Sequence, residues 1–173
     1  MTRIFVDLDG VMADFDAHFP ALFGVNHKDL LDDEMWKHIN NHPSYFRDMP
    51  LCDGAVDFWD WLVNLTMACS LEPPIILTAC SKTNYGGVAR QKKEWVRENP
   101  ILGYYEGVEY PMVLPVLGGR NKCLFLQEPG DILIDDWDHN TIPWIAEGGR
   151  AILHTDFGTT STLLQGMADR FEF

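Results

Sequence analysis

Near its beginning the chain reads Phe5-Val6-Asp7-Leu8-Asp9-Gly10-Val11, in which an apolar run stops abruptly at two carboxylates. Short apolar runs rich in β-branched and aliphatic residues are typical of strands buried on both faces, as in a parallel sheet. Side chains two residues apart lie on the same side of an extended segment, so Asp7 and Asp9 should point the same way. Gly10 then permits a tight turn. This stretch predicts a buried strand with two acidic side chains at its carboxyl end.

The same pattern, an apolar run that ends at a polar residue, recurs along the chain. Thr78 follows the run 75–77, Asp135 follows 132–134, and His154 follows 151–153. Ligands bind beyond the carboxyl ends of the strands in open α/β sheets. Asp7, Thr78 and Asp135 are therefore expected to meet at one edge of a sheet.

Segments with helical spacing lie between the apolar runs. They cover about residues 54–68, with Asp53 as the expected N-cap, then 87–98 and 140–147. Strands that alternate with helices predict an α/β fold with a doubly wound parallel sheet.

Residues 15–50 do not fit this alternation. The segment is rich in aromatic residues and histidines, and it is far longer than the usual strand-to-helix loop of about 2–6 residues. We interpret it as a small helical cap inserted after the first strand, so that residues 1–14 and 51–173 form the core domain. Asp14 is the expected helix cap at its start. The histidines lack metal-ligand spacing and are interpreted as packing or surface residues, with His18 the one that could line a pocket.

Composition limits the partners of the chain. Its 173 residues hold 13 Lys and Arg against 26 Asp and Glu, a net charge of −13. Such a chain has no general attraction for polynucleotides or anionic membranes, although a metal or a helix N-terminus could still bind a small anion. No apolar run approaches the roughly 18 residues of a membrane span. Four well-separated cysteines and no signal-peptide pattern indicate a cytoplasmic protein; an oligomer is compatible with the sequence but not predicted by it.

The residue types at the strand ends suit phosphate chemistry. Carboxylates hold Mg²⁺, and an aspartate can also act as a nucleophile. The alternative is an Asp-Gly turn at the surface. Helical spacing places Lys92 on the inward face with Val88 and Trp95, whereas Lys93 lies about 100° further round and should face solvent. Lys92 is thus the candidate phosphate-binding lysine, with a snorkelling surface side chain as the alternative.

Five segments carry a further signal, in this order along the chain: Asp7-Leu8-Asp9-Gly10-Val11-Met12-Ala13-Asp14-Phe15, Phe46-Arg47-Asp48-Met49-Pro50 with Gly54-Ala55, Lys92-Lys93-Glu94-Trp95-Val96, Asp131-Ile132-Leu133-Ile134-Asp135-Asp136, and Gly148-Gly149-Arg150-Ala151-Ile152-Leu153-His154. Together they resemble the haloacid dehalogenase-like phosphatase superfamily, and within it the 5′(3′)-deoxyribonucleotidase family.

The resemblance implies roles for the acidic residues. Asp7 would be the nucleophile, and Asp9 would be the acid/base that protonates the leaving alcohol and then activates water. Mg²⁺ would be bound by the Asp7 carboxylate, the Asp9 backbone carbonyl and Asp135. Asp136 would have a supporting role, orienting water or Lys92. A protonated Asp9 requires a raised pKa.

The resemblance also implies substrate contacts. Thr78 would hold the phosphate through its hydroxyl and the N–H groups that follow it, although by itself it reads as an ordinary strand residue. Ala79 stands where some family members carry serine. Phe15 matches the position that stacks on the nucleobase, with a packing role as the alternative. Two further groups are weaker candidates for substrate binding: the aromatic Phe46 and Trp36, and the pair Arg120 and Lys122, which would contact phosphate or simply decorate a loop. Trp137 replaces an arginine that often follows the acidic pair.

The favoured function is a Mg²⁺-dependent phosphomonoesterase that hydrolyses deoxyribonucleoside monophosphates through an aspartyl-phosphate. The partner would be a small phosphate ester, not a polynucleotide. The first alternative is the same chemistry on another small ester such as a sugar phosphate. A non-catalytic phosphoryl-binding module and a receiver-like phosphoryl switch are further alternatives, but a receiver lacks both the inserted cap and the acid/base at Asp9.

Overall fold

The computed structural model describes residues 2–99, 111–170 and 172–173, and within them five strands form one parallel sheet. The spatial order is β3-β2-β1-β4-β5, so the first strand lies at the centre. The strands are β1 (Ile4–Val6), β2 (Ile75–Cys80), β3 (Val113–Leu117), β4 (Ile132–Asp135) and β5 (Arg150–Leu153). The predicted α/β fold with a parallel sheet is confirmed.

The register of the central strands aligns their carboxyl ends. Val6 of β1 is level with Ile76 of β2 and with Ile134 of β4. The backbone N–H of Asp7 donates to the carbonyl of Ile134 at 2.9 Å, which carries the pairing one residue further. The polar residues that end these strands therefore leave the sheet at the same edge.

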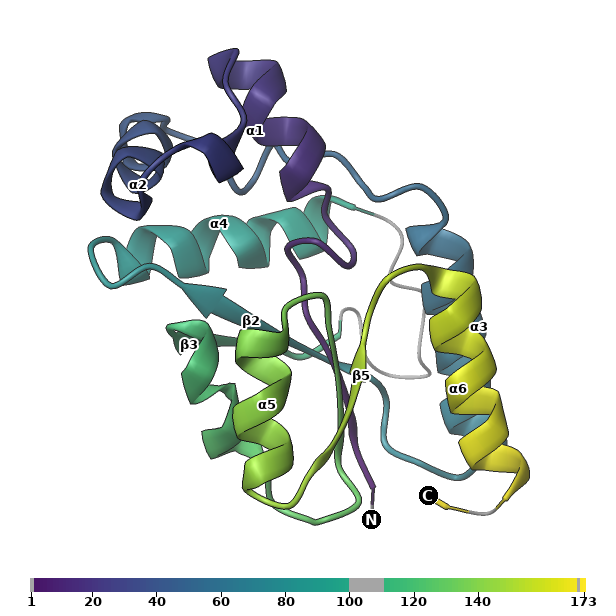
Figure 1. The fold of residues 1–173 in the computed structure, drawn as a ribbon. Helices are drawn as coiled ribbons and strands as arrows, with labels where there is room; N and C mark the ends of the chain where they lie inside the picture. The colour runs from purple at the N-terminus through teal and green to yellow at the C-terminus, as the bar shows by residue number, and fades with distance from the viewer. Residues whose placement is uncertain (1, 100–110, 171) are drawn as a thin grey trace.

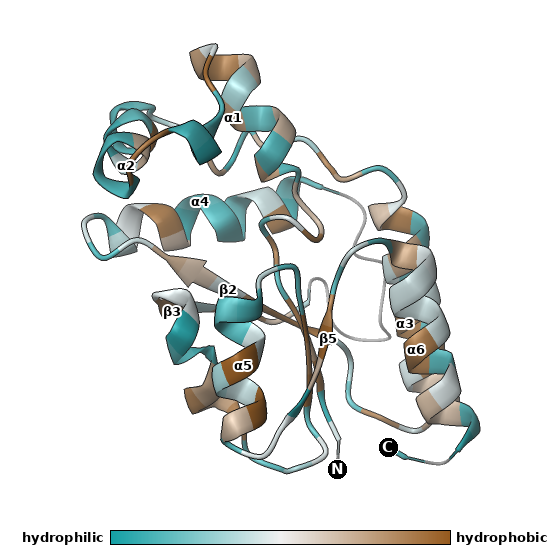
Figure 2. Cartoon of the chain, viewed as in Figure 1, coloured by the Kyte–Doolittle hydropathy of each residue, from teal (hydrophilic) through white to brown (hydrophobic). Residues whose placement is uncertain are grey.

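Helices cover both faces of the sheet, as expected of a doubly wound fold (Figure 1). One face packs against α3 (Ala55–Ala68), α4 (Tyr85–Glu98) and α6 (Phe157–Asp169), and the other against α5 (Asp138–Ala146) and η2 (Gly119–Phe125). Alternate residues of β1 supply the two cores: Ile4 and Val6 join the first, and Phe5 joins the second with Trp144. Figure 2 shows the apolar strands between these layers.

Residues 15–50 are largely helical. They form α1 (Phe15–Phe23), η1 (His27–Asp29) and α2 (Asp32–Asn41), which lie at the end of the molecule opposite to the two termini (Figure 1). Asp14 caps α1 as expected, because its carboxylate accepts a hydrogen bond from the Ala17 N–H at 2.8 Å. The segments that lead into and out of this region lie side by side, since the Asp14 N–H donates to the carbonyl of Pro50. Its status as a separate cap domain stays a prediction.

Three local features differ from the sequence expectation. Strand β3 and helix α6 are additional elements. The N-cap of α3 is Gly54 rather than Asp53: Gly54 has φ of 84°, and no side-chain hydrogen bond caps this helix. Glycine takes that left-handed backbone without the clash that a Cβ would cause, which allows the chain to turn sharply into α3.

None of the helices in the described residues is both long and apolar enough to span a membrane.

Candidate active site

The turn after β1 holds the first acidic side chain in a fixed orientation. Asp7 is buried, and its Oδ1 accepts a hydrogen bond from the Leu8 N–H at 2.7 Å. Gly10 continues the turn with φ of 77°, and a Cβ at this position would lie 2.2 Å from Oδ2 of Asp136. The carboxylate of Asp136 therefore rests against the backbone of Gly10, and only glycine leaves room for it.

Three carboxylates gather at the carboxyl ends of β1 and β4. One oxygen of each of Asp7, Asp135 and Asp136 lies within 4.8 Å of the others. Burial raises the pKa of Asp7, and Asp135 adds to the effect against the opposing charge of Lys122. Burial, together with Asp7 and Asp135, raises the pKa of Asp136 to about 7. Crowded carboxylates of this kind suit a hard divalent cation, and Mg²⁺ binds through one or two such groups while it keeps several waters.

Lys122 contacts two of these three carboxylates. The lysine extends from η2 and has 0% of its surface exposed; its Nζ is 2.7 Å from Oδ1 of Asp7 and 2.5 Å from Oδ2 of Asp135. Burial lowers the pKa of a lysine, but the two carboxylates outweigh that effect and raise the pKa of Lys122. The sequence left open whether Lys122 contacts phosphate or is only a surface side chain of a loop. Because its side chain is fully enclosed, the second interpretation is wrong.

Asn140 is a site residue that the sequence analysis missed. Its Nδ2 donates to Oδ1 and Oδ2 of Asp135 at 3.0 and 3.2 Å, and the N–H of Trp137 donates to Oδ1 at 3.0 Å. Asn140 belongs to the first turn of α5, which starts three residues after Asp135. The proximity of an amide side chain to the end of β4 was the available signal. These contacts fix the orientation of the Asp135 carboxylate.

Lys92 joins three groups on the other side of the site through hydrogen bonds. Its Nζ donates to Oδ2 of Asp9 at 2.6 Å, to Oγ1 of Thr78 at 2.9 Å and to the carbonyl of Ala79 at 2.5 Å. The side chain has 0% of its surface exposed, whereas Lys93 is exposed. The prediction from helical spacing that Lys92 faces inward and Lys93 faces solvent is thus confirmed, and the phosphate-binding role of Lys92 stays a prediction. The three hydrogens of the ammonium match its three oxygen partners.

The two oxygens of Asp9 have different surroundings. Oδ2 pairs with Lys92, whereas Oδ1 is buried and has no hydrogen-bond partner within the described residues. Burial is the main cause that raises the pKa of Asp9, and the nearby charge of Asp7 adds to it, while Lys92 opposes both. The direction agrees with the sequence expectation. Because its pKa is raised and no described group donates to Oδ1, Asp9 can carry a proton on that oxygen.

The aromatic candidates from residues 15–50 pack closely with their neighbours. Phe15 is half-buried in α1, with its ring centroid 5.6 Å from that of Tyr45 and 5.0 Å from that of His27. Trp36 is half-buried on α2 and packs against the first of the two cores, the one that contains Ile4 and Val6. Phe46 is 2% exposed, and its ring centroid lies 4.8 Å from Nζ of Lys92. The structure places Phe46 beside the ammonium of Lys92 and leaves little of its ring open to solvent.

Three of the remaining candidates lie on the core domain, and His18 lies on α1. Ala79 is half-buried on β2 and contributes its carbonyl to Lys92, and Arg120 is exposed on η2. Trp137 is 56% exposed and stacks on His139 with ring centroids 4.7 Å apart. His18 is buried against Tyr45, where its Nε2 lies 3.1 Å from the carbonyl of that residue, in keeping with a packing role.

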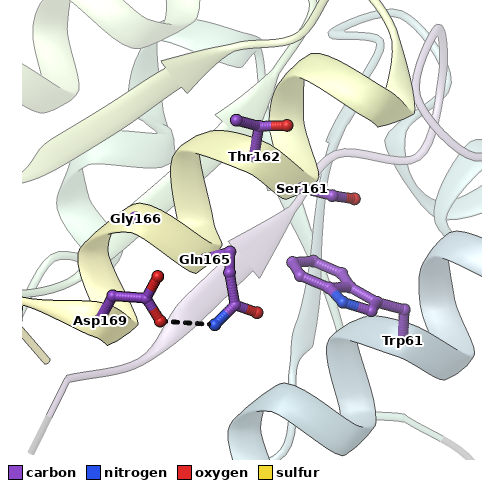
Figure 3. A pocket seen from close by; sticks show the side chains of 6 residues that line it. All are labelled: Trp61, Ser161, Thr162, Gln165, Gly166 and Asp169. Carbon is purple, nitrogen blue, oxygen red and sulfur yellow. Dashed lines mark hydrogen bonds between the residues drawn. The ribbon is translucent and has the colours of Figure 1, made fainter.

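A shallow surface hollow lies between α3 and α6, away from these carboxylates (Figure 3). Its lining includes Trp61 and Gln165, and the amide of Gln165 donates to Asp169 at 2.8 Å. None of the strand-end candidate residues lines it.

No family model matches the chain, and no curated protein matches it. Among solved structures, a hydrolase from Streptococcus pneumoniae TIGR4 is 13% identical with a TM-score of 0.47, over 94% of this chain and 97% of that one. A hydrolase of the haloacid dehalogenase-like family from Streptococcus pneumoniae is 14% identical with a TM-score of 0.45, over 87% and 83%.

A haloacid dehalogenase hydrolase of family IA, variant 3, from Entamoeba histolytica HM-1:IMSS is 14% identical with a TM-score of 0.37, over 87% of this chain and 82% of that one.

Proposed function

We propose that the chain is a Mg²⁺-dependent phosphomonoesterase of the haloacid dehalogenase-like type, with Asp7 as its nucleophile. One observation carries the proposal: the Asp7 carboxylate lies within 4.8 Å of those of Asp135 and Asp136 and contacts the buried ammonium of Lys122. This arrangement supplies a nucleophile, ligands for a cation and a fixed positive charge in one place. Phosphoryl transfer depends mainly on such positioning and charge stabilisation.

The hydrogen bonds of Asp7 distinguish its two oxygens. Oδ1 accepts from the Leu8 N–H and contacts Nζ of Lys122, both at 2.7 Å. These two donors fix the orientation of the carboxylate that would attack phosphorus. When bound, Mg²⁺ would be held by Asp7 and Asp135, with Asp136 beside them and the backbone carbonyl of Asp9 as the resemblance implies, and it would offset the repulsion between carboxylate and phosphate.

Asp9 would move the protons. Its Oδ1 is buried and has no hydrogen-bond partner among the residues that the structure describes, so it can give a proton to the leaving oxygen as the P–O bond breaks. The same oxygen can then take a proton from the water that hydrolyses the aspartyl-phosphate. Lys92 holds Oδ2 of Asp9 and the hydroxyl of Thr78 at 2.6 and 2.9 Å, so it would keep the acid/base and the phosphate-binding hydroxyl in register.

The proposed substrate is a deoxyribonucleoside monophosphate. The resemblance supports this substrate, as does the aromatic content of residues 15–50, because nucleobases stack well on aromatic rings. The net charge of −13 argues against a polynucleotide. A sugar phosphate or another small ester is the second candidate. It is favoured by the burial of Phe46, which is 2% exposed and leaves little open ring surface for a base.

Phosphate release from a panel of esters tests the proposal. The panel holds 5′- and 3′-deoxyribonucleoside monophosphates, ribonucleotides and sugar phosphates, each with Mg²⁺ and with EDTA. We expect Mg²⁺-dependent release, fastest from deoxyribonucleotides, and none from Asp7→Asn. Release only from other esters would support the proposed reaction but contradict a nucleotide as its substrate. Wild-type activity in Asp7→Asn would refute the nucleophile.

A further inference from the structure

Helix α4 holds the last part of the 15–50 segment through side-chain hydrogen bonds. Oε1 of Gln91 accepts from the N–H of Phe46 at 3.0 Å, and its Nε2 donates to the carbonyl of Pro43 at 3.3 Å. One turn further, Nε1 of Trp95 donates to the carbonyl of Met49 at 2.7 Å. Both side chains are buried. The backbone on either side of Phe46 is therefore fixed to the helix that carries Lys92.

This attachment places the Phe46 ring against the ammonium of Lys92. The ring centroid lies 4.8 Å from Nζ, and the two residues are 2% and 0% exposed. The three hydrogens of the ammonium already have oxygen partners on Asp9, Thr78 and Ala79. An aromatic face at this distance attracts a cation without needing a hydrogen bond, and the attraction grows when water is excluded.

We propose that Phe46 is a positioning residue that acts through Lys92, with Gln91 holding its backbone in place. The ring keeps water away from the ammonium and thereby keeps Lys92 on Asp9 and Thr78. This role differs from the substrate contact expected from the sequence. A base-stacking ring would affect nucleotides alone, whereas a ring that acts through Lys92 affects every ester alike.

The kinetic test rests on the proposed phosphatase function and compares Phe46→Leu with Phe46→Tyr. Leucine removes the aromatic face, whereas tyrosine retains it. For Phe46→Leu we expect kcat to fall by about fivefold to tenfold, with KM within about twofold of wild type, for a deoxyribonucleotide and a sugar phosphate alike. Phe46→Tyr should stay close to wild type. A rise in KM confined to nucleotides, or an unchanged kcat, would overturn the proposal.

Phe58→Leu is the matched control, because Phe58 is also a buried phenylalanine but stacks on Phe157, away from the lysine. We expect it to leave kcat unchanged. An equal loss of kcat in Phe58→Leu would mean that any missing core ring slows the protein, and the proposal would be wrong.

A second readout does not depend on activity. NMR of lysine side chains labelled with carbon-13 should show one set of Cε protons displaced by the ring current of Phe46, assigned by its absence in Lys92→Met. We expect the displacement to disappear in Phe46→Leu, to shrink in Gln91→Leu and to persist in Phe58→Leu. A resonance that does not move in Phe46→Leu would refute the contact. Failure of wild type to hydrolyse any ester would refute the phosphatase instead, and these spectra would still decide the contact.

Discussion

At the scale of single residues, the site contains two buried lysines, and each is paired with different carboxylates. Lys122 contacts Asp7 and Asp135, and Lys92 contacts Asp9. A charge without exposed surface is costly unless it is paired, so each lysine depends on its carboxylates as much as they depend on it. The removal of either partner should therefore leave an uncompensated buried charge.

Lys122→Met tests this dependence, because methionine fills a similar volume without the charge. Asp7 and Asp135 would then face each other without their shared cation, and we expect the free energy of unfolding at neutral pH in EDTA to fall by about 3–5 kcal/mol. Urea denaturation measures the change. Lys93→Met is the control, because Lys93 is exposed, and it should change stability by less than about 0.5 kcal/mol. Equal stability of Lys122→Met and wild type would contradict the pairing.

Asp9→Asn tests the proton carrier. Asparagine has nearly the same shape but cannot give up a proton as a carboxylic acid does. We expect kcat to fall by about 10²–10⁴-fold, the usual contribution of a general acid/base. Steady-state phosphate release measures the loss, and Mg²⁺ titration should show binding retained, because Asp7, Asp135 and Asp136 remain. Near-wild-type turnover would assign the proton transfer to another group.

The sequence predicts correctly which side chains are buried where they follow the period of a helix or a strand. Lys92 and Lys93 are adjacent, yet the helical period separates a buried from an exposed side chain, as observed. Lys122 lies on the short 3₁₀ segment η2, which has no apolar stripe to show which way its side chain points. Asn140 was missed although it follows β4 closely in the sequence, because its contact with Asp135 depends on how α5 packs onto the sheet.

At the scale of elements, the strands that the sequence predicted are those with uninterrupted apolar runs. β3 was missed because Pro115 interrupts its run, and proline is tolerated there because β3 is an edge strand. α6 was missed because it is rich in threonine, serine and glycine and buries few residues, among them Thr160 and Leu164. Weak propensity and a narrow buried stripe leave little pattern to detect.

The start of β4 depends on a buried carboxylate that also holds the N-terminal segment. Asp131 has no exposed surface and accepts hydrogen bonds from the backbone and side chain of Arg3 and from the N–H groups of Gln127 and Glu128. Burial alone would raise its pKa, but these donors outweigh burial and lower the pKa of Asp131. The charged form is therefore the one that stabilises the pairing of β1 with β4.

Asp131→Asn should show a stability defect that depends on pH. The folded pKa of Asp131 lies below the unfolded value, so its contribution is complete above about pH 4 and is lost as the pH falls through the folded pKa. We expect a loss of about 3 kcal/mol at pH 7 that shrinks at pH 3, measured by urea denaturation at both values. Asp57→Asn on the exposed face of α3 is the control. A defect of equal size at both pH values would mean that charge is not involved.

At the scale of the whole molecule, the chain carries an excess of negative charge although its site is proposed to bind an anion. The net charge of −13 repels a phosphate, and the two buried lysines are already paired with carboxylates of the chain. A bound divalent cation would supply the missing positive charge. Stability and Mg²⁺ binding should then be linked, because a ligand that binds only the folded state stabilises it.

Asp136 provides the sharpest test of that link. Burial, with Asp7 and Asp135 close by, raises its folded pKa to about 7, against about 3.9 when unfolded. The unfolded chain loses this proton between about pH 4 and 7 while the folded chain retains it, so the stability of the metal-free protein falls through that window. Asp136→Asn removes the penalty. In EDTA we therefore expect its Tm to exceed that of wild type at pH 8 but not at pH 4.

Added Mg²⁺ should reverse that order. In wild type the cation offsets the crowding of Asp7, Asp135 and Asp136, so Mg²⁺ should raise the Tm at pH 8; Asp136→Asn, with one fewer carboxylate, should gain less. Asp57→Asn has the same change in net charge outside the site, and it should respond to Mg²⁺ as wild type does, which separates specific binding from general attraction to an acidic protein. An equal Mg²⁺ response in all three proteins would mean that the cation binds the acidic surface at large, and the three carboxylates would then be no metal site.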